Sequence, residues 1–225
     1  MINLILIPKS SKMNGKIKME KKQVPDIVVA RLPLYLQTLN RLEQEGEYNT
    51  SSKDLGNRIG ISAAQIRKDL SHFGEFGKQG TGYSISFLKE KLENILNVDR
   101  VWDMALIGVG FLGHAIANFG GFTNHGFQIK CIFDNDPQKI GTKIGQYEIF
   151  DSTRLEEVIQ KEKIKVAMIT VDAEHAQKVT DQLVKIGVKA ILNYAPVKLI
   201  TPKDIQVQNI DPIIELQHMT YYLDY

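Results

Sequence analysis

From residue 103 to the end of the chain, short apolar segments alternate with amphipathic helical segments, and this alternation restricts the fold most strongly. The apolar segments predict strands at Met104–Ile107, Ile129–Phe133, Val166–Thr170 and Ala190–Asn193, with a shorter one at Tyr147–Phe150. Helices are predicted between them and at the end of the chain, at Leu112–Asn118, Thr153–Lys161, Ala173–Ile186 and Pro212–Leu223. Such alternation is typical of a parallel sheet covered by helices on both faces. We therefore predict a doubly wound α/β domain over residues 98–225.

The turn after the first predicted strand carries a glycine motif. It reads Gly108-Val109-Gly110-Phe111-Leu112-Gly113, and Asp134 ends the next strand 21 residues after it. In a unit of this type the first glycine forms the turn, the second admits a pyrophosphate and the third lets the helix pack on the strand. The carboxylate of Asp134 would accept the ribose 2′-hydroxyl and repel the additional phosphate of NADP. The spacing therefore predicts a Rossmann domain that binds NAD(H), with a glycine turn that binds nothing as the alternative.

The sequence offers no clear set of groups for redox catalysis. Tyr194 and Lys198 match the Tyr-x-x-x-Lys spacing of short-chain dehydrogenases, but Pro196 lies between them and would break the helix that this pair requires. No proton donor stands out at the end of a predicted strand. We therefore expect a sensor of the nucleotide and not an enzyme. Two alternatives remain: an NAD-dependent oxidoreductase with an appended regulatory domain, and a sensor of another nucleotide such as coenzyme A.

The first part of the chain is more basic than the second. Residues 1–97 carry 15 Lys and Arg against 10 Asp and Glu, whereas residues 98–225 carry 13 against 16. Residues 1–23 alone contain six lysines and one glutamate without a sustained period, which predicts a disordered basic arm. A later start of the chain, at Met13 or Met19, is the alternative. The charge difference indicates two domains, the first of which would face a polyanion.

Three helices are predicted in the first domain. The first runs over Pro25–Gly46, the second begins at a serine cap at Ser51 or Ser52, and the third begins at a capping box formed by Ser62 and Gln65. A tight turn at Gly60 joins the second and third helices. Two short helices joined by a glycine turn are typical of a helix-turn-helix.

A glycine-rich segment follows the third helix. Glycines at positions 74, 77, 80 and 82 precede the alternating segment Ser84–Phe87 and predict a small β-hairpin. A linker helix is predicted next, at Lys89–Leu96. A helix-turn-helix followed by such a hairpin predicts a winged-helix domain over residues 24–97.

The third helix carries polar side chains that would contact DNA. Ile66, Leu70 and Phe73 recur at helical intervals and form its buried stripe. Polar and basic side chains lie off that stripe, where they would reach base edges and phosphates in a major groove. They are Gln65, Arg67, Lys68, Ser71 and His72, with Lys78 and Gln79 at the hairpin. We therefore predict binding to double-stranded DNA, with an ordinary amphipathic helix that has a solvated face as the alternative.

Composition excludes metalloproteins and membrane proteins. The five histidines never pair at helical intervals, so no metal site is predicted. The single cysteine, Cys131, lies in an apolar run and is expected to be a core residue. No apolar segment approaches the ~20 residues of a membrane span. One cysteine without a partner suits a reducing compartment, and we expect the protein in the cytoplasm.

The last predicted helix carries an apolar stripe. Its members recur at helical intervals and are Ile213, Leu216, Met219, Tyr222 and Leu223. An exposed patch of this kind is unusual for a monomer. The stripe therefore predicts a homodimer, whereas packing of the helix on its own sheet is the alternative.

Five segments of the chain follow one another in an order that resembles a known family. They are Arg67–Gly74, Gly80–Tyr83, Gly108–Gly113, Phe133–Asp136 and Ile191–Pro196. Together they resemble Rex, the family of bacterial redox-sensing transcriptional repressors, from about Val24 to Leu223. The resemblance implies a homodimer that binds inverted-repeat operators through its winged helices, senses NADH against NAD⁺ in its Rossmann domains, and is released from DNA by NADH. It also implies that the final helix is exchanged with the partner subunit.

The resemblance also assigns individual residues. It implies that Gly108, Gly110, Gly113 and Asp134 hold the adenosine diphosphate half of the cofactor. It implies that Thr170, Val171, Asn193, Tyr194 and Ala195 line the nicotinamide half. An arginine, a tyrosine and an aspartate form a redox-dependent contact in the family, and the corresponding positions here are Gln37, Phe119 and Asp211. Only Asp211, which we count with the cofactor-binding residues, matches, so we expect NAD⁺ to counteract NADH less than in a relative with all three.

Overall fold

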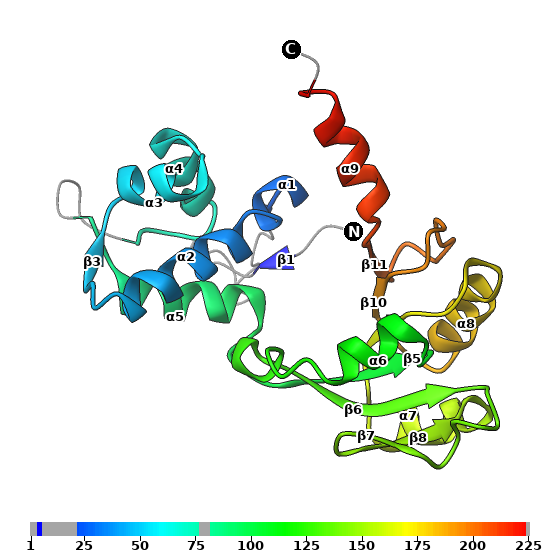
Figure 1. Cartoon of the computed structure of the whole chain (residues 1–225). Coiled ribbons are helices and arrows are strands. Elements are labelled where there is room, and N and C mark those ends of the chain that lie inside the picture. The colour runs from blue at the N-terminus through cyan, green and yellow to red at the C-terminus, as the bar shows by residue number, and fades with distance from the viewer. Residues whose placement is uncertain (1–3, 6–21, 77–81, 224–225) are drawn as a thin grey trace, which may run out of the picture. The chain divides into compact units, whose positions relative to one another are not determined.

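The computed structural model describes residues 4–5, 22–76 and 82–223. The chain divides into two compact units between Asp99 and Arg100 (Figure 1). Most of the predicted basic arm lies outside the described residues. Of its described residues, Leu4–Ile5 (β1) and Lys22–Gln23 (β2) pair in an antiparallel ladder. The expectation of a disordered arm is therefore wrong for these four residues.

The N-terminal unit packs helices around one apolar core. Its further elements are α1 (Asp26–Val29), α2 (Leu32–Gln44), β3 (Asn49–Thr50), α3 (Ser52–Ile59), α4 (Ala63–Ser71), β4 (Tyr83–Ser84) and α5 (Ile85–Leu96). Ser51 and Ser62 cap α3 and α4 as predicted, because their hydroxyl oxygens accept from the backbone N–H groups of Asp54 and Gln65. Side chains from α2, α3, α4 and α5 fill the core. The buried side chains of α4, Ile66 and Leu70, hold this helix in place by packing in the core.

The helix predicted over Pro25–Gly46 is interrupted. The structure has α1 and α2 in its place, and Arg31 is the N-cap residue of α2. Pro33 lies in the first turn of α2, and proline has no N–H group with which to continue the hydrogen-bond ladder from the preceding turn. The interruption brings Arg31 to a junction between two helices.

The predicted strand Ser84–Phe87 is a strand only at Ser84 and becomes a helix from Ile85, so the prediction was wrong for Ile85–Phe87. The hydroxyl oxygen of Ser84 accepts from the N–H of Phe87 and caps α5. Nor is α5 a separate linker, since Leu88 and Leu92 recur at a helical interval and are fully buried in the core. The short strand β4 pairs antiparallel with β3, and residues 77–81, where the tip of the predicted hairpin would lie, are outside the described residues.

The C-terminal unit contains the predicted parallel sheet. Its strands are β5 (Trp102–Ile107), β6 (Phe127–Asp134), β7 (Lys143–Ile144), β8 (Tyr147–Asp151), β9 (Val166–Ile169), β10 (Ala190–Asn193) and β11 (Gln206–Asn209). Within the described residues, these seven strands form one sheet in the order β11-β10-β9-β5-β6-β8-β7. Neighbouring strands are parallel except for β7 with β8.

Helices cover both faces of this sheet. They are α6 (Phe111–Ala117), α7 (Leu155–Lys161) and α8 (Ala173–Lys185), with short 3₁₀ turns at Thr123–His125 (η1) and Ser152–Arg154 (η2). Along β5, Ala105 and Ile107 pack in a core with α7 and α8, whereas Met104 and Leu106 pack in a second core with α6. This alternation confirms the doubly wound arrangement. Cys131 is buried in the first core, as predicted, and burial raises the pKa of its thiol to about 12.

In this unit the observed elements that differ from the predicted ones are mostly polar or short. The edge strand β11 reads Gln-Val-Gln-Asn and is mostly exposed, so it carries no apolar alternation by which to predict it. The last helix, α9 (Pro212–Thr220), ends before the predicted Leu223. No helix in the described part of the chain has the length and apolar character to cross a membrane. The described residues also contain no group of three His, Cys, Asp or Glu side chains placed to hold a metal ion.

Candidate functional site

The carboxyl ends of β5, β6 and β9 meet at a cavity of about 420 Å³. Six of the predicted cofactor-binding residues line it, namely Gly108, Val109, Gly110, Asp134, Thr170 and Val171. The sequence analysis missed further lining residues, among them Asn135, Lys139, Thr153, Asp172, His175 and Lys178. Most of these follow the carboxyl end of a parallel strand, which is where ligands bind in sheets of this type, and that position is the signal that could have found them.

The glycine turn at this cavity is held by hydrogen bonds from the neighbouring strand. Gly108 has a φ of +92°, and a Cβ atom there would lie 2.7 Å from Cγ1 of Val171. The hydroxyl of Thr170 donates to the carbonyl oxygen of Gly108 at 2.7 Å. A Cβ atom at Gly113 would collide with that same carbonyl, whereas one at Gly110 would meet nothing within 4 Å. The first and third glycines therefore serve close packing, and the second leaves open space at the start of α6.

Asp134 connects the glycine turn to the end of β6. Its side chain is buried, and its Oδ2 accepts from the N–H of Val109 at 2.6 Å while its Oδ1 accepts from the N–H of Asp136 at 2.9 Å. The Nζ of Lys139 lies 3.4 Å from Oδ2. Burial alone would raise the pKa of Asp134, but the backbone hydrogen bonds and the charge of Lys139 together lower it. The carboxylate is thus ionised and retains acceptor capacity beside the cavity.

The residues predicted for the nicotinamide half fall into two groups. Thr170 and Val171 line the cavity, whereas Asn193, Tyr194 and Ala195 lie at the end of β10 and are not part of its lining. Asn193 is fully buried, and its Nδ2 donates to the carbonyl of Val197 and to Oδ1 of Asn209, each at 2.9 Å. The side chain of Asn193 therefore holds the loop after β10 against β11. Burial raises the pKa of the Tyr194 hydroxyl.

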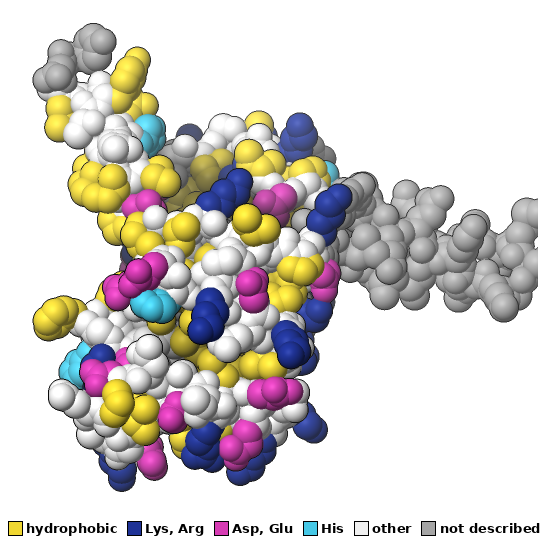
Figure 2. All heavy atoms as spheres, turned by 90° about the vertical axis from the view of Figure 1, so that its right-hand side faces the viewer, with side chains coloured by type: hydrophobic (Ala, Val, Ile, Leu, Met, Phe, Trp, Pro, Cys, Tyr) yellow, Lys and Arg dark blue, Asp and Glu magenta, His cyan; other side chains and the backbone are white. Residues whose placement is uncertain are grey.

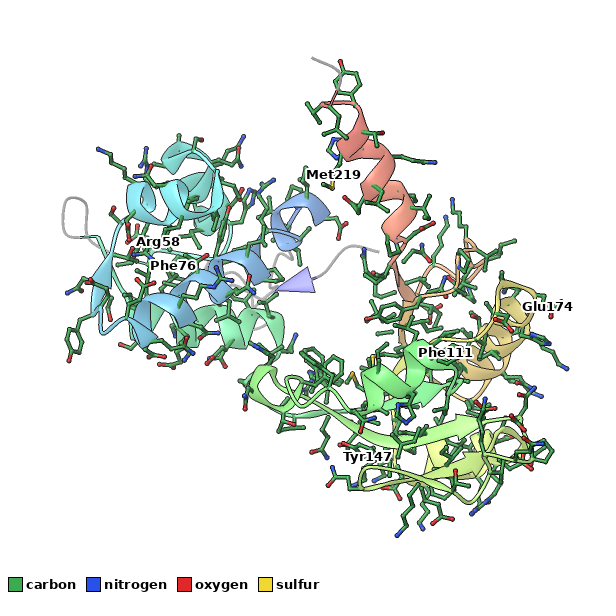
Figure 3. All side chains as sticks on the ribbon, in the orientation of Figure 1. Arg58, Phe76, Phe111, Tyr147, Glu174 and Met219 are labelled. Atoms are coloured by element: carbon green, nitrogen blue, oxygen red, sulfur yellow. The ribbon has the colours of Figure 1, made fainter. Side chains whose placement is uncertain are left out.

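Two residues of the glycine motif do not face the cavity. Phe111, at the first position of α6 (Figure 3), is fully exposed, and Leu112 is also exposed. Neither lines the cavity, so a contact of these two predicted residues with the cofactor would come from their backbone N–H groups at the start of α6. The motif needs glycines at three positions and leaves the side chains between them free to point away.

The predicted DNA-contacting helix, α4, exposes a basic surface. Its Ile66 and Leu70 are buried as predicted, and Arg67, Lys68 and Ser71 are exposed. Nη1 of Arg67 donates to the hydroxyl of Ser52 at 2.9 Å, which ties α4 to the start of α3, and the hydroxyl of Ser71 donates to the carbonyl of Lys68. Lys68 is exposed on this surface, and no hydrogen bond or ion pair of its ammonium group is found among the described residues.

One acidic residue of α4 is buried and was missed by the sequence analysis. Asp69 is fully buried, and its carboxylate accepts from Nε and Nη2 of Arg31 at 2.6 and 2.7 Å, from the hydroxyl of Tyr35 at 2.6 Å and from Nε2 of Gln65 at 2.7 Å. Burial would raise the pKa of Asp69, but hydrogen bonds from these partners lower it. The position of Asp69 beside Leu70, on the same side as Ile66, is the signal that could have found it.

The remaining predicted DNA contacts differ from expectation. Gln65 is half-buried and bonded to Asp69, so its side chain is not freely solvated. His72 is also half-buried, and its Nδ1 is buried without a hydrogen-bond partner among the described residues, so this atom faces inward. Lys78 and Gln79 lie outside the described residues.

Comparison with known proteins agrees with this geometry. Residues 23–71 match the family described as putative DNA-binding protein N-terminus, and residues 99–197 match the family described as CoA binding domain. A redox-sensing transcriptional repressor Rex of Chloroflexus aurantiacus is 50% identical over 206 residues, which cover 91% of this chain and 97% of that protein. The chain belongs to the Rex family.

Solved Rex structures share the fold over most of the chain. RSP, a Rex-family repressor, superposes with a TM-score of 0.85 at 37% identity in its complex with β-NAD⁺ and operator DNA, covering 91% of this chain and 94% of RSP. Its complex with β-NADH gives a TM-score of 0.82 at 35% identity, covering 91% of this chain and 96% of RSP. Both units described above therefore have counterparts in one Rex protein.

The three positions for which the resemblance implies a redox-dependent contact are Gln37, Phe119 and Asp211. Gln37 on α2 is exposed, and Phe119 packs edge-on against Phe122 with ring centroids 5.0 Å apart. The Oδ1 atom of Asp211 accepts from the N–H of Ile213 at 3.0 Å and caps α9. One oxygen of Asp211 is thus already bonded within its own helix.

Proposed function

We propose that this Rex-family chain is a transcriptional repressor that senses the ratio of NADH to NAD⁺ and leaves its operator when NADH binds. The observation that carries the proposal is the cavity at which the buried carboxylate of Asp134 meets the glycine turn, in a chain that also contains a helix-turn-helix. RSP, whose fold the chain shares, has been crystallised with β-NAD⁺ and operator DNA and with β-NADH. We assign DNA binding to residues 24–97 and cofactor binding to residues 98–225.

The cavity fits the adenosine and pyrophosphate half of NAD(H). Gly110 leaves the space that a pyrophosphate requires, and the N-terminus of α6 begins there. The ionised carboxylate of Asp134 would accept ribose hydroxyl groups, as its position at the end of β6 suggests. The nicotinamide half would extend from Thr170 and Val171 toward Tyr194 and Ala195 at the end of β10. Asn193 would position that loop and not touch the cofactor with its side chain.

Operator binding would use α4. This helix exposes Lys68 and Arg67 to phosphates and bases, and its capped N-terminus at Ser62 places Gln65 in the first turn, where helices of this motif contact base edges. In a dimer, two copies of α4 would contact two half-sites of an inverted repeat, one helical turn or a multiple apart.

The exposed apolar surface of α9 supports a homodimer. No residue of α9 is buried, and Ile213, Leu216 and Met219 are each more than half exposed. Figure 2 shows hydrophobic side chains gathered over this helix. A second copy of the chain, exchanging α9 as the family resemblance implies, would cover them. The cytoplasm is the compartment in which such a repressor meets both DNA and the nicotinamide pool.

The same site supports a sensor better than an oxidoreductase. Residues 194–198 are not helical, so Tyr194 and Lys198 do not form the pair that short-chain dehydrogenases use. Asn193 at the end of β10 has its side chain bonded to the protein. Incubation with NADH and common carbonyl substrates should give no steady turnover, and sustained NADH oxidation would favour the enzyme.

Calorimetric titration of the purified chain with NADH, NADPH and coenzyme A tests the ligand. The proposal predicts one NADH bound per chain and much weaker binding of the other two. Tighter binding of coenzyme A, whose name the matching family of residues 99–197 carries, would contradict it. Analysis of ligands that co-purify with the protein provides an independent check.

A further inference from the structure

A fully buried carboxylate on α4 bonds four donors, and stability alone does not account for it. Replacing a buried ion pair with apolar side chains of similar volume is often neutral or stabilising, because the desolvation of the charges offsets their attraction. Asp69 nevertheless bonds Arg31, Tyr35 and Gln65 through both of its oxygens. Such a carboxylate holds the groups that donate to it in a fixed direction, which an apolar side chain cannot do.

Gln65 is the donor in this cluster that is partly exposed at the start of α4. It belongs to the first turn of the helix and is half-buried, whereas Tyr35 is fully buried. Its Nε2 donates to Oδ1 of Asp69 at 2.7 Å. Among the described residues, no partner is found for Oε1 of Gln65 or for its second amide hydrogen. A fixed amide that presents one acceptor and one donor matches N6 and N7 of adenine in the major groove.

We infer that Asp69 is a positioning residue for DNA recognition, whose carboxylate orients the amide of Gln65 so that α4 selects an A·T base pair in each half-site. The inference rests on the proposed role of α4 as the helix that contacts operator bases. Arg31 holds the carboxylate by two parallel hydrogen bonds, and Tyr35 adds a third. The direction of the Gln65 amide is therefore set by the junction of α1 and α2 through Asp69.

Selection of duplexes from a random DNA library tests this inference, with the full-length protein and its variants in the absence of NADH. Gln65→Ala and Asp69→Asn should both lose the preference for the same A·T pair, by about 5- to 150-fold in relative affinity, and keep the other selected positions. The double variant should lose no more than Gln65→Ala alone, because the two residues act as one unit. Tyr35→Phe should keep the preference, since it leaves the bond to Gln65 in place.

A matched control is available on α8. There Nε2 of Gln177 donates to Oδ1 of Asp181 at 2.8 Å, the same pair of residue types at the same spacing, in the other unit. Asp181→Asn should leave the selected sequence unchanged. If Asp69→Asn folds and keeps the full preference, the inference is overturned. It is also overturned if Asp69→Asn weakens binding to all duplexes by one common factor.

A second variant covers a failure of Asp69→Asn to fold. Combining Arg31→Met, Tyr35→Phe and Asp69→Leu replaces the charged cluster with apolar side chains, and thermal unfolding shows whether the core persists. A folded triple variant should lose the A·T preference. If it keeps the preference, or if neither variant folds, the role of Asp69 is purely structural.

Lys68→Ala distinguishes a failure of this inference from a failure of the proposed DNA contact by α4. If neither Lys68→Ala nor Gln65→Ala changes binding, the role of α4 itself fails; if Lys68→Ala weakens binding but Asp69→Asn changes nothing, only this inference fails.

Discussion

At the scale of single residues, Asp134 is the side chain on which we expect the choice between NADH and NADPH to depend. Its carboxylate accepts from the glycine turn and lines the cavity, where we expect it to accept the ribose 2′-hydroxyl of NAD(H). Asp134→Ala should weaken NADH binding by about 10- to 150-fold, because a hydrogen bond to a charged group contributes about 1.5–3 kcal/mol. The difference between NADH and NADPH should narrow, since the charge that repels the extra phosphate is gone.

Calorimetry on both nucleotides measures these affinities. Asp136→Asn is the matched control, because Asp136 follows the same strand but does not line the cavity. Equal affinity of the native protein for NADH and NADPH would contradict the assigned role of Asp134.

On α4, Lys68 would contact either a base or a phosphate of the operator, and its substitution distinguishes the two. If Lys68 contacts a base, Lys68→Ala should weaken operator binding by about 1–3 kcal/mol with the loss confined to one base pair. If it contacts a phosphate, the loss of affinity should apply to all duplexes. The plot of the logarithm of the DNA association constant against the logarithm of the salt concentration should then become less steep by ~0.9. Arg67→Ala should also weaken binding, although its bond to Ser52 holds part of the guanidinium. Fluorescence anisotropy at several salt concentrations measures both slopes, and no effect of either variant would exclude α4 as the DNA-contacting helix.

At the scale of a single element, we predict that formation of the dimer depends on α9. Its apolar side chains are exposed within the described chain, so removal of the helix should remove the surface on which a dimer depends. Truncation after Asp211 should give a monomer in analytical ultracentrifugation. Leu216→Asp should do the same, whereas Gln217→Asp places the same charge at a polar position and should leave a dimer. A truncated chain that stays dimeric and soluble would refute a main role for α9.

At the scale of the whole molecule, the residues at the three positions of the contact that the Rex resemblance implies lead us to expect a weaker switch between NADH and NAD⁺. Phe119 has no hydroxyl to donate, and Gln37 offers Asp211 only a neutral amide, which forms a hydrogen bond roughly half as strong as a charge-assisted one. One oxygen of Asp211 already caps α9. Gln37→Arg with Phe119→Tyr should therefore widen the difference in operator affinity between NADH and NAD⁺. Each single substitution serves as the control, and an unchanged difference in the double variant would show that the switch uses other residues.

Local patterns were sufficient to predict most of the molecule. The period of two in β5, the spacing of the glycines and the acid at the end of β6 predicted the sheet and the cavity, because each depends on neighbours in sequence. The polar edge strand β11 escaped prediction, since it has no apolar face to bury. The start of α5 was missed because Ser84–Phe87 alternates over a length too short to distinguish a strand from a capped helix.

Tertiary contacts account for what the sequence could not predict at the sites. No role was predicted for Asp69, and its hydrogen bonds to Arg31 and Tyr35, which lie 38 and 34 positions away in the chain, could not be read from local spacing. In the same way, the side chain of Asn193 is bonded to Asn209 on a strand that was not predicted. Local spacing therefore located the sites, and long-range packing decided which side chains remain free to bind.

The most direct test of a repressor controlled by NADH is a titration of the native protein with its selected operator duplex, at fixed salt, in the presence of NADH and then of NAD⁺. A ligand shifts DNA affinity only by its differential binding to the DNA-bound and free conformations. We expect saturating NADH to lower operator affinity by about 5- to 150-fold, the usual range of coupling between two sites, and NAD⁺ to leave the complex intact. Equal operator affinity with both nucleotides would contradict it.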